Sequence, residues 1–209
     1  MPRYSEKQKI ALEALMKDDV HRHAVAILET EGHQGLTVER LAKEIGVARG
    51  TLYNYFKDRD AIVEFVEERT FTPVVEGLEE ISKSDLPPLQ KLETFITQTF
   101  TKEYELGKVL IAVTRAHRKG QRRLTGEEAG EEGRSGRFVL ALRSIVQEGI
   151  DSGDFLNLQT ELIADIILGA MRGLTIQMVS SGKLQKPEEI LPTFLTIIFG
   201  GLTGNSYPN

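Results

Sequence analysis

The chain has 209 residues, of which 40% are hydrophobic and 27% are charged, and this composition is typical of a globular protein with one or two domains. It contains no cysteine, which excludes disulfides, thiolate metal sites and thiol nucleophiles. The net charge of −5 excludes a protein that binds nucleic acid through a general excess of positive charge. Any nucleic-acid binding must therefore use a few placed groups.

The N-terminus and the apolar runs favour a cytoplasmic protein with no membrane partner. Charged residues occur among the first fifteen residues, where a signal peptide needs an apolar run. The most apolar stretch, Leu162–Val179, is interrupted by Asp165 and Arg172. The stretch Ile190–Leu202 has 13 residues, whereas a membrane span needs about 20 apolar residues.

Apolar residues recur with helical spacing along the chain, and no segment shows the alternation of a strand, so an all-α fold is expected. Thr37 is placed to cap a helix start, and Gly46 is placed to end the same helix. Pro73 and the pair Pro87–Pro88 are expected to interrupt the middle of the chain. The expected helices are 20–31 (ended by Gly32), 38–45, about 48–55, one after the capping residue Asp58, 89–105, 107–117, 138–149, 161–180 and 187–202, with a loop or frayed helix start at 118–136.

Residues 36–66, LTVERLAKEIGVARGTLYNYFKDRDAIVEFV, carry the most informative pattern. Two short helices are joined by a tight turn at Gly46, where glycine permits a backbone conformation that is costly for other residues. Ala42 is small, so the two helices can approach each other closely. This is the pattern of a helix-turn-helix, whose second helix can enter a DNA major groove about 12 Å wide.

Over about residues 20–66 the sequence resembles the TetR family of bacterial transcriptional regulators. The spacing GVxxGTLYxYF, followed by Arg59–Ile62 at the next helix start, is the most specific part of the resemblance. The resemblance implies an N-terminal helix-turn-helix DNA-binding domain over 1–66 and a larger helical ligand-binding and dimerisation domain over 67–209. It implies a homodimeric repressor that a small-molecule ligand releases from a palindromic, double-stranded DNA operator, with no cofactor and no enzymatic activity.

The resemblance also assigns roles to single residues. Hydroxyl, amine and guanidinium groups along the motif would contact phosphates, which fixes the register without reading sequence. Side chains of the second helix would reach base edges: Arg49 suits guanine, Asn54 suits adenine, and Tyr53 can pack on a thymine methyl group. The phosphate candidates are Thr37, Thr51, Tyr55, Lys57 and Arg59, and the base-reading candidates are Arg49, Gly50, Tyr53 and Asn54.

Three features depart from the family pattern or admit another interpretation. Ala48 stands where the family often has a capping serine or threonine, which costs the second helix about 1 kcal/mol. Residues 1–60 contain 10 basic and 10 acidic residues, which predicts modest nonspecific DNA affinity. Tyr53 and Tyr55 could both be core aromatics, although two positions apart on a helix they point in different directions, so at least one should be exposed.

The last two expected helices are apolar on more than one face, which points to a second subunit. Gly169 and Gly173 would allow another helix to approach closely, and Phe194 and Ile198 would add apolar contact from the last helix. A twofold partner buries such faces economically, and the resemblance implies the same pairing of the last two long helices. A fully buried core helix in a monomer is the alternative.

Ligand binding rests on the resemblance, and the sequence does not identify the ligand. Arg115, His117 and Arg172 could hold an anionic group, or they could be solvated surface charges. The candidate lining residues, each of which could also be ordinary core, are Phe100, Tyr104, Phe138, Met171, Thr175 and Met178.

Two other classes of protein fit this sequence less well than a DNA-binding regulator. An enzyme is disfavoured, because no nucleophile turn, phosphate loop or dinucleotide-binding motif occurs. His21 and His23 do not share a helix face, so a metal pair is not expected there, and no catalytic or metal site is assigned. A helical small-molecule-binding or adaptor protein that has lost DNA binding is the remaining alternative.

Overall fold

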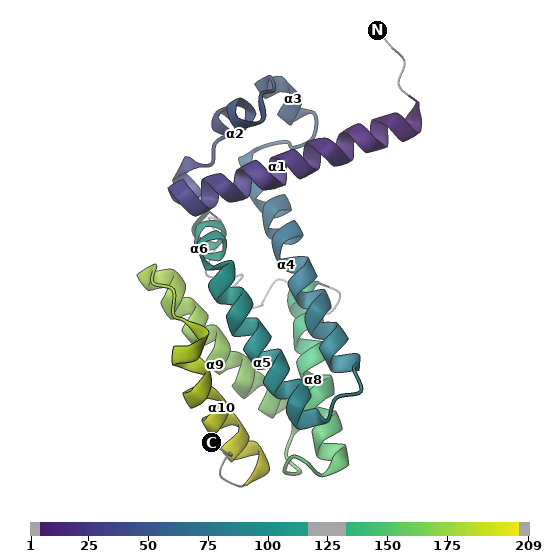
Figure 1. Ribbon diagram of the computed structural model, residues 1–209, viewed down its shortest axis with the longest axis vertical. Coiled ribbons are helices and arrows are strands. Elements are labelled where there is room, and N and C mark those ends of the chain that lie inside the picture. The colour runs from purple at the N-terminus through teal and green to yellow at the C-terminus, as the bar shows by residue number, and fades with distance from the viewer. Residues whose placement is uncertain (1–4, 117–132, 205–209) are drawn as a thin grey trace.

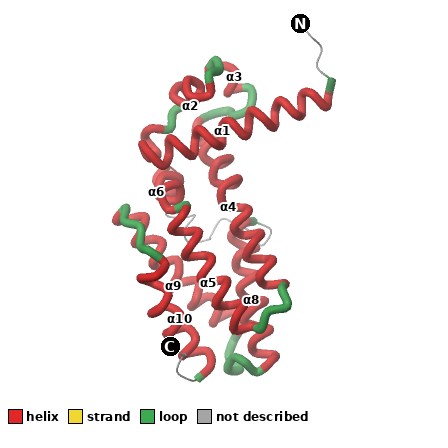
Figure 2. Tube along the Cα trace, in the orientation of Figure 1, coloured by secondary structure: helices red, strands yellow, loops and turns green. Residues whose placement is uncertain are grey.

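The computed structural model describes residues 5–116 and 133–204, and every regular element in these ranges is an α-helix (Figures 1 and 2). The predicted all-α fold is confirmed. Residue His117 and most of the expected loop at 118–136 lie outside the described residues. The helices are α1 (Glu6–Gly35), α2 (Val38–Ile45), α3 (Arg49–Tyr53), α4 (Arg59–Lys83), α5 (Pro88–Glu105), α6 (Gly107–Ala116), α8 (Arg134–Ser152), α9 (Thr160–Ser181) and α10 (Pro187–Thr203).

The ends of α2 and the start of α4 form as their residues predict. Thr37 accepts a hydrogen bond from the backbone N–H of Arg40 at 3.1 Å and so caps α2. Gly46 ends α2 in the left-handed region, with φ 80°, and its N–H donates to the carbonyl of Ala42 at 2.9 Å. Asp58 caps α4 by accepting from the N–H of Ala61 at 2.8 Å.

Helix α1 is longer than the periodic stretch that predicted it. It begins at Glu6, where Ser5 and Gln8 form a capping box, and residues 5–15 are exposed as the helix projects beyond the rest of the molecule (Figure 1). At the other end, Gly32 interrupts the helical backbone with φ 68°, at the position where the sequence predicted the helix to stop. One further turn then leads to Gly35.

The prediction that Pro73 interrupts the chain is wrong, because α4 continues through it. A proline inside a helix removes one backbone hydrogen bond, which normally kinks or ends the helix. Here the segments on both sides are held by burial: Val66 packs in one core, and Val75 and Leu78 are buried further along. This packing keeps one helix running from the N-terminal helices in among the C-terminal helices (Figure 1).

Two hydrophobic cores divide the molecule. The first joins α1–α4 and also includes Val109 and Val113 of α6, which packs against α1. The second lies among α4, α5, α8, α9 and α10 and is centred on Phe95, Leu142 and Phe199. Helix α4 contributes to both cores, so it links the N-terminal helices physically to the C-terminal ones.

Candidate functional site

Helix α3 presents one buried and one open face. Leu52 is fully buried against the N-terminal core, whereas Arg49, Gly50, Tyr53 and Asn54 are exposed. Tyr53 is 42% exposed, which confirms that at least one of the two tyrosines of the motif points outward. The four residues assigned to base reading therefore share one accessible surface at the outer end of the molecule (Figure 1).

Arg49 is held in place before any DNA arrives. One terminal nitrogen of its guanidinium lies 2.6 Å from a carboxylate oxygen of Glu39 on α2, and the other donates to the hydroxyl of Tyr53 at 2.9 Å. The guanidinium carbon is 5.3 Å from the centre of the Tyr53 ring, within cation–π range. If Arg49 reads a guanine, as the sequence predicts, that base must take the place of Glu39.

The residues assigned to phosphate contact lie at the same end of the molecule but differ in solvent exposure and in the hydrogen bonds they already make. Thr37 and Lys57 are exposed, while Thr51 and Tyr55 are half-buried. Arg59 is committed to backbone: its Nε donates to the carbonyl of Leu36 at 2.6 Å, and a terminal nitrogen donates to the carbonyl of His33. Its phosphate contact remains a prediction, and Arg59 has a positioning role that the sequence did not indicate.

The start of α3 confirms one expectation and adds another feature. Ala48 makes no side-chain capping bond, as its methyl group predicts. A Cβ atom built on Gly50 meets nothing within 4 Å, so this exposed stretch of backbone is open to close approach by a partner.

A pocket of about 220 Å³ adjoins the second core, because Leu168 and Met171 in its wall belong to that core. Its walls come from α4, α5, α6, α8 and α9, and they are mostly apolar. Three of the residues proposed from sequence line it, namely Phe138, Met171 and Thr175. The others do not: Phe100, Tyr104 and Met178 border a neighbouring cavity of about 10 Å³, which has room for about one water molecule.

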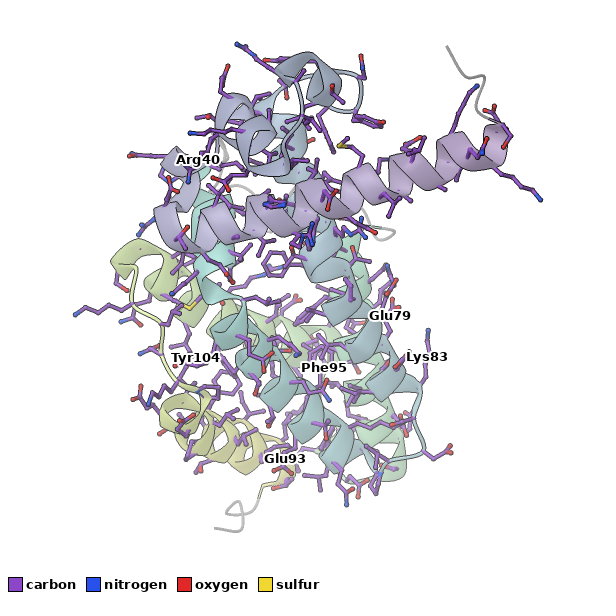
Figure 3. The ribbon with its side chains drawn as sticks, turned by 45° about the horizontal axis from the view of Figure 1, so that its top comes forward. Arg40, Glu79, Lys83, Glu93, Phe95 and Tyr104 are labelled. Carbon is purple, nitrogen blue, oxygen red and sulfur yellow. The ribbon has the colours of Figure 1, made fainter. Side chains whose placement is uncertain are left out.

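Glu103 of α5 is the polar group between these two cavities, since it lines both of them together with Thr175. The hydroxyl of Thr175 on α9 donates to Oε1 of Glu103 at 2.8 Å. Glu103 is half-buried, and desolvation of its carboxyl raises its pKa to about 7, against the smaller lowering effect of the Thr175 hydrogen bond. In Figure 3 the next residue, Tyr104, marks this end of α5, whereas Glu93 lies at the opposite end.

Charged side chains from several helices surround the rest of the pocket. Arg134 of α8 pairs with the carboxylate of Glu67 on α4, contacts Glu68 at 3.3 Å and lies 5.6 Å from the Phe71 ring centre. Lys102 and Arg172 also line the pocket. The sequence named Arg172 as a possible anion anchor, and desolvation lowers its pKa. Arg115 instead donates to the carbonyl of Val179 at 2.8 Å, away from the pocket lining.

An exposed apolar face runs along α9 and part of α10. Gly169 and Gly173 lie on it, and a Cβ atom on either would meet nothing within 4 Å. By contrast, Phe194 and Ile198, which the sequence assigned to a dimer interface, are buried in the protomer's own core. Their side chains pack there because this side of α10 faces the core of its own protomer. The large apolar side chains exposed on this face are Leu162, Ile166, Ile176 and Ile197.

Helix α9 is, within residues 5–116 and 133–204, the one helix long and apolar enough by composition to cross a membrane. Of its most apolar stretch, 44% is buried inside the protomer. Some of its apolar residues thus belong to the protomer's core, and the others form the exposed face just described. Among the described residues, no group of three or more histidine or acidic side chains is placed to hold a metal ion.

Comparisons with known proteins agree with this geometry. Residues 22–66 match the model of the family described as bacterial regulatory proteins, tetR family. The chain is 28% identical over 149 residues to the fatty acid metabolism regulator protein of Bacillus subtilis, covering 71% of this chain and 75% of that protein. It is 24% identical over 195 residues to the HTH-type transcriptional repressor KstR2 of Mycolicibacterium smegmatis, covering 91% and 92%. The helix-turn-helix domain, residues 22–66, belongs to the TetR family.

Solved structures of transcriptional regulators share the fold over most of the chain. FadR from Bacillus subtilis in complex with stearoyl-CoA superposes with a TM-score of 0.68 at 22% identity, covering 88% of this chain and 97% of that one. FadR from Bacillus halodurans gives 0.69 at 20% identity, covering 96% and 98%. The TetR-family helix-turn-helix makes this chain a DNA-binding transcriptional regulator, and an adaptor that has lost DNA binding is not favoured.

Sequence reasoning missed several residues that line the 220 Å³ pocket. The sequence does indicate the position of Glu103. It follows Phe95 and Thr99 at intervals of four, so a charged side chain lies on the buried face of α5. Phe71 and Arg134 had none, because their contact joins residues 63 positions apart in the chain. Only the packing of α4 against α8 brings them together.

Proposed function

We propose that this protein is a dimeric repressor, located in the cytoplasm and without catalytic activity, that a small-molecule ligand releases from its operator. The observation that carries the proposal is the continuous helix α4, which begins at the helix-turn-helix and forms a wall of the 220 Å³ pocket. Arg59 ties its first turn to the end of α1, directly before the cap of α2, while Glu67 and Phe71 lie at the pocket. A change at the pocket can therefore move the DNA-binding helices.

The dimer supplies the operator geometry. Two copies joined through the exposed face of α9 and Ile197 of α10 would bury the apolar surface that the protomer leaves open. Their recognition helices would then enter major grooves about one helical turn apart, ~34–36 Å, on a pseudo-palindromic site. A twofold protein requires a site of this kind because each half-site meets the same four exposed residues, which lie in α3 and at its C-cap.

The ligand we propose is an acyl thioester of coenzyme A or a molecule of similar character, with an apolar body and an anionic head. A TetR-family relative carries fatty acid metabolism in its name, and a neighbouring structure contains stearoyl-CoA. The pocket fits this chemistry because apolar walls accompany Lys102, Arg134 and Arg172, three cationic side chains. Only the apolar body can enter 220 Å³, so the bulk of the head would remain outside.

Release follows from differential binding. A ligand lowers operator affinity only if it binds the DNA-free arrangement more tightly than the DNA-bound one. An anionic head that pairs with Arg134 would compete with Glu67 and Glu68, and so would loosen the link between α8 and α4. Without that link α4 can move, and its movement changes the distance between the two recognition helices of the dimer.

The test is release of a labelled operator duplex, measured by fluorescence anisotropy. Decanoyl-CoA and stearoyl-CoA would each be titrated into the complex, with coenzyme A alone as the control. We expect at least one thioester to dissociate the complex at micromolar concentration, while coenzyme A does not. Dissociation by coenzyme A alone, or by none of the three, would overturn the proposed ligand class. Arg134→Gln removes the link itself, so it should bind the operator more weakly without ligand and respond less to the thioester.

A further inference from the structure

The two oxygens of Glu103 have different surroundings. Oε1 accepts from the Thr175 hydroxyl at 2.8 Å, whereas Oε2 has no hydrogen-bond partner among the described residues. In that part of the chain the one fully enclosed side-chain nitrogen or oxygen without a partner is Nε of Arg143. Oε2 must therefore border open space, and the open space beside Glu103 is the pocket and its small neighbouring cavity.

A carboxyl oxygen without a hydrogen-bond partner makes the binding of a plain hydrocarbon in this apolar pocket less favourable. A buried polar group without a partner costs about 1–3 kcal/mol, and a plain apolar ligand would leave Oε2 in that state after displacing water. The same site favours a ligand that brings a hydrogen-bond donor to Oε2. Selectivity for hydroxyl-bearing molecules arises in this way, because the site's own polar group stays unpaired with the wrong ligand.

The charge around the pocket decides which donor fits. Lys102, Arg134 and Arg172 line it, against the carboxylates Glu67 and Glu103, so its lining is net positive even with Glu103 ionised. A cationic amine would meet this positive surrounding, whereas a neutral hydroxyl would not. A hydroxyl also serves both protonation states of Glu103, since it can donate to a carboxylate or exchange hydrogen bonds with a carboxylic acid.

We propose that the ligand of this pocket carries a hydroxyl group on its buried apolar body, and that Glu103 is the residue that selects it. This rests on the proposed function only in taking the pocket as the ligand site. Thr175 has a positioning role: its hydroxyl lies within hydrogen-bond distance of both Oε1 of Glu103 and the carbonyl of Met171, and so orients the carboxyl from α9. The hydroxyl would bind where α5 and α9 meet.

Phenol and toluene provide a matched pair of probes, because they have nearly the same shape and differ in the hydroxyl group. One-site binding of each would be measured by ligand-observed NMR on the full chain. We expect the wild-type protein to bind phenol at least tenfold more tightly than toluene, although toluene is the more hydrophobic. Glu103→Leu should reverse this order, and Glu103→Gln, which keeps a polar side chain, should retain it.

The matched control is Glu93→Leu, which alters an exposed glutamate of the same helix far from the pocket (Figure 3). It should bind both probes as the wild-type protein does. Tighter binding of toluene than phenol by the wild-type protein, an unchanged preference in Glu103→Leu, or no binding of either probe would overturn the proposal. Release of the operator by acyl thioesters is measured separately. If no thioester released the operator while the wild-type protein still preferred phenol to toluene, the proposed function would be contradicted and the role of Glu103 would stand.

Discussion

Arg59, the first residue of α4, donates a hydrogen bond from Nε to the carbonyl oxygen of Leu36 at 2.6 Å. Leu36 directly precedes Thr37, the capping residue of α2. A second donation, to the carbonyl of His33, reaches the last turn of α1. One guanidinium thus joins the helix that reaches the ligand pocket to the loop that orients the helix-turn-helix.

Replacing Arg59 with alanine should affect both stability and DNA binding. Two carbonyl oxygens lose their donor, so the free energy of unfolding should fall by about 1–3 kcal/mol in urea titrations. Affinity should fall for all DNA sequences alike, and the salt dependence should weaken by about one phosphate contact. Lys83→Ala, at the other end of α4, is the control. Lost stability with an unchanged salt slope would show that Arg59 positions the motif without touching phosphate.

Gly50→Ala tests how closely α3 approaches DNA. A Cβ atom at this position meets no protein atom within 4 Å, and alanine favours a helix by up to about 1 kcal/mol over glycine. The variant should therefore be as stable as the wild-type protein but bind its operator at least tenfold more weakly, in filter-binding or anisotropy assays. Gly77→Ala on α4, equally free of neighbours, should raise stability by up to about 1 kcal/mol and leave operator affinity unchanged. Wild-type affinity in Gly50→Ala would show that the backbone at this position stays away from the bases.

Gly173→Glu tests the dimer surface. The protomer offers space for the side chain, so helicity by circular dichroism should be retained. A carboxylate in the centre of an apolar interface would lose its water without a partner, which strongly disfavours association. Sedimentation equilibrium should therefore show a dimer for the wild-type protein and a monomer for the variant. Leu140→Glu, on the exposed side of α8, should remain dimeric, and a dimeric Gly173→Glu would place the interface elsewhere.

Stability should depend on pH through Glu103. Its pKa is raised to about 7 in the folded protein from 4.5, chiefly by desolvation, so the folded state favours the protonated form. The contribution to stability is fully present below about pH 4.5 and is lost as the pH rises through about 7, with a total of up to about 3 kcal/mol. Urea unfolding at about pH 5 and about pH 8 should show this loss in the wild-type protein relative to Glu103→Gln.

Glu93→Gln is the control for that comparison, because Glu93 is exposed on the same helix. Other groups titrate in this range, including His21, whose pKa is lowered by desolvation and by Arg69. Their effects cancel when each variant is compared with the wild-type protein at the same pH. An equal pH dependence in the wild-type protein and Glu103→Gln would show that the carboxyl is solvated.

The parts of the fold that local chemistry determines could be predicted from the sequence. Thr37, Gly46 and Asp58 end or begin their helices through bonds within a few residues, and the structure shows each of them. The path of α4 through Pro73 could not be predicted, because packing on both sides outweighs a local preference. The placement of Phe194 and Ile198 also depended on which face of α10 meets the core, and composition alone does not decide this.

The candidate site also has a part that the local sequence predicts and a part that depends on tertiary packing. Exposure of Arg49, Gly50, Tyr53 and Asn54 follows from the short helix and its single buried residue, Leu52, which the motif already contains. The pocket is built by five helices from distant parts of the chain, so its lining depends on tertiary packing. The sequence placed three of its six candidates in the main pocket and could not show that Arg59 turns toward the backbone.

The most direct test of a sequence-specific dimeric regulator is selection of bound duplexes from a random DNA pool at physiological salt, with Arg49→Ala in parallel. Arg49 is exposed and already aligned by Glu39 and Tyr53, so it should read one base of each half-site. We expect the wild-type protein to enrich an inverted repeat and Arg49→Ala to lose the preference at one position of each half-site. No enrichment by the wild-type protein, including after refolding to remove bound ligand, would contradict the account.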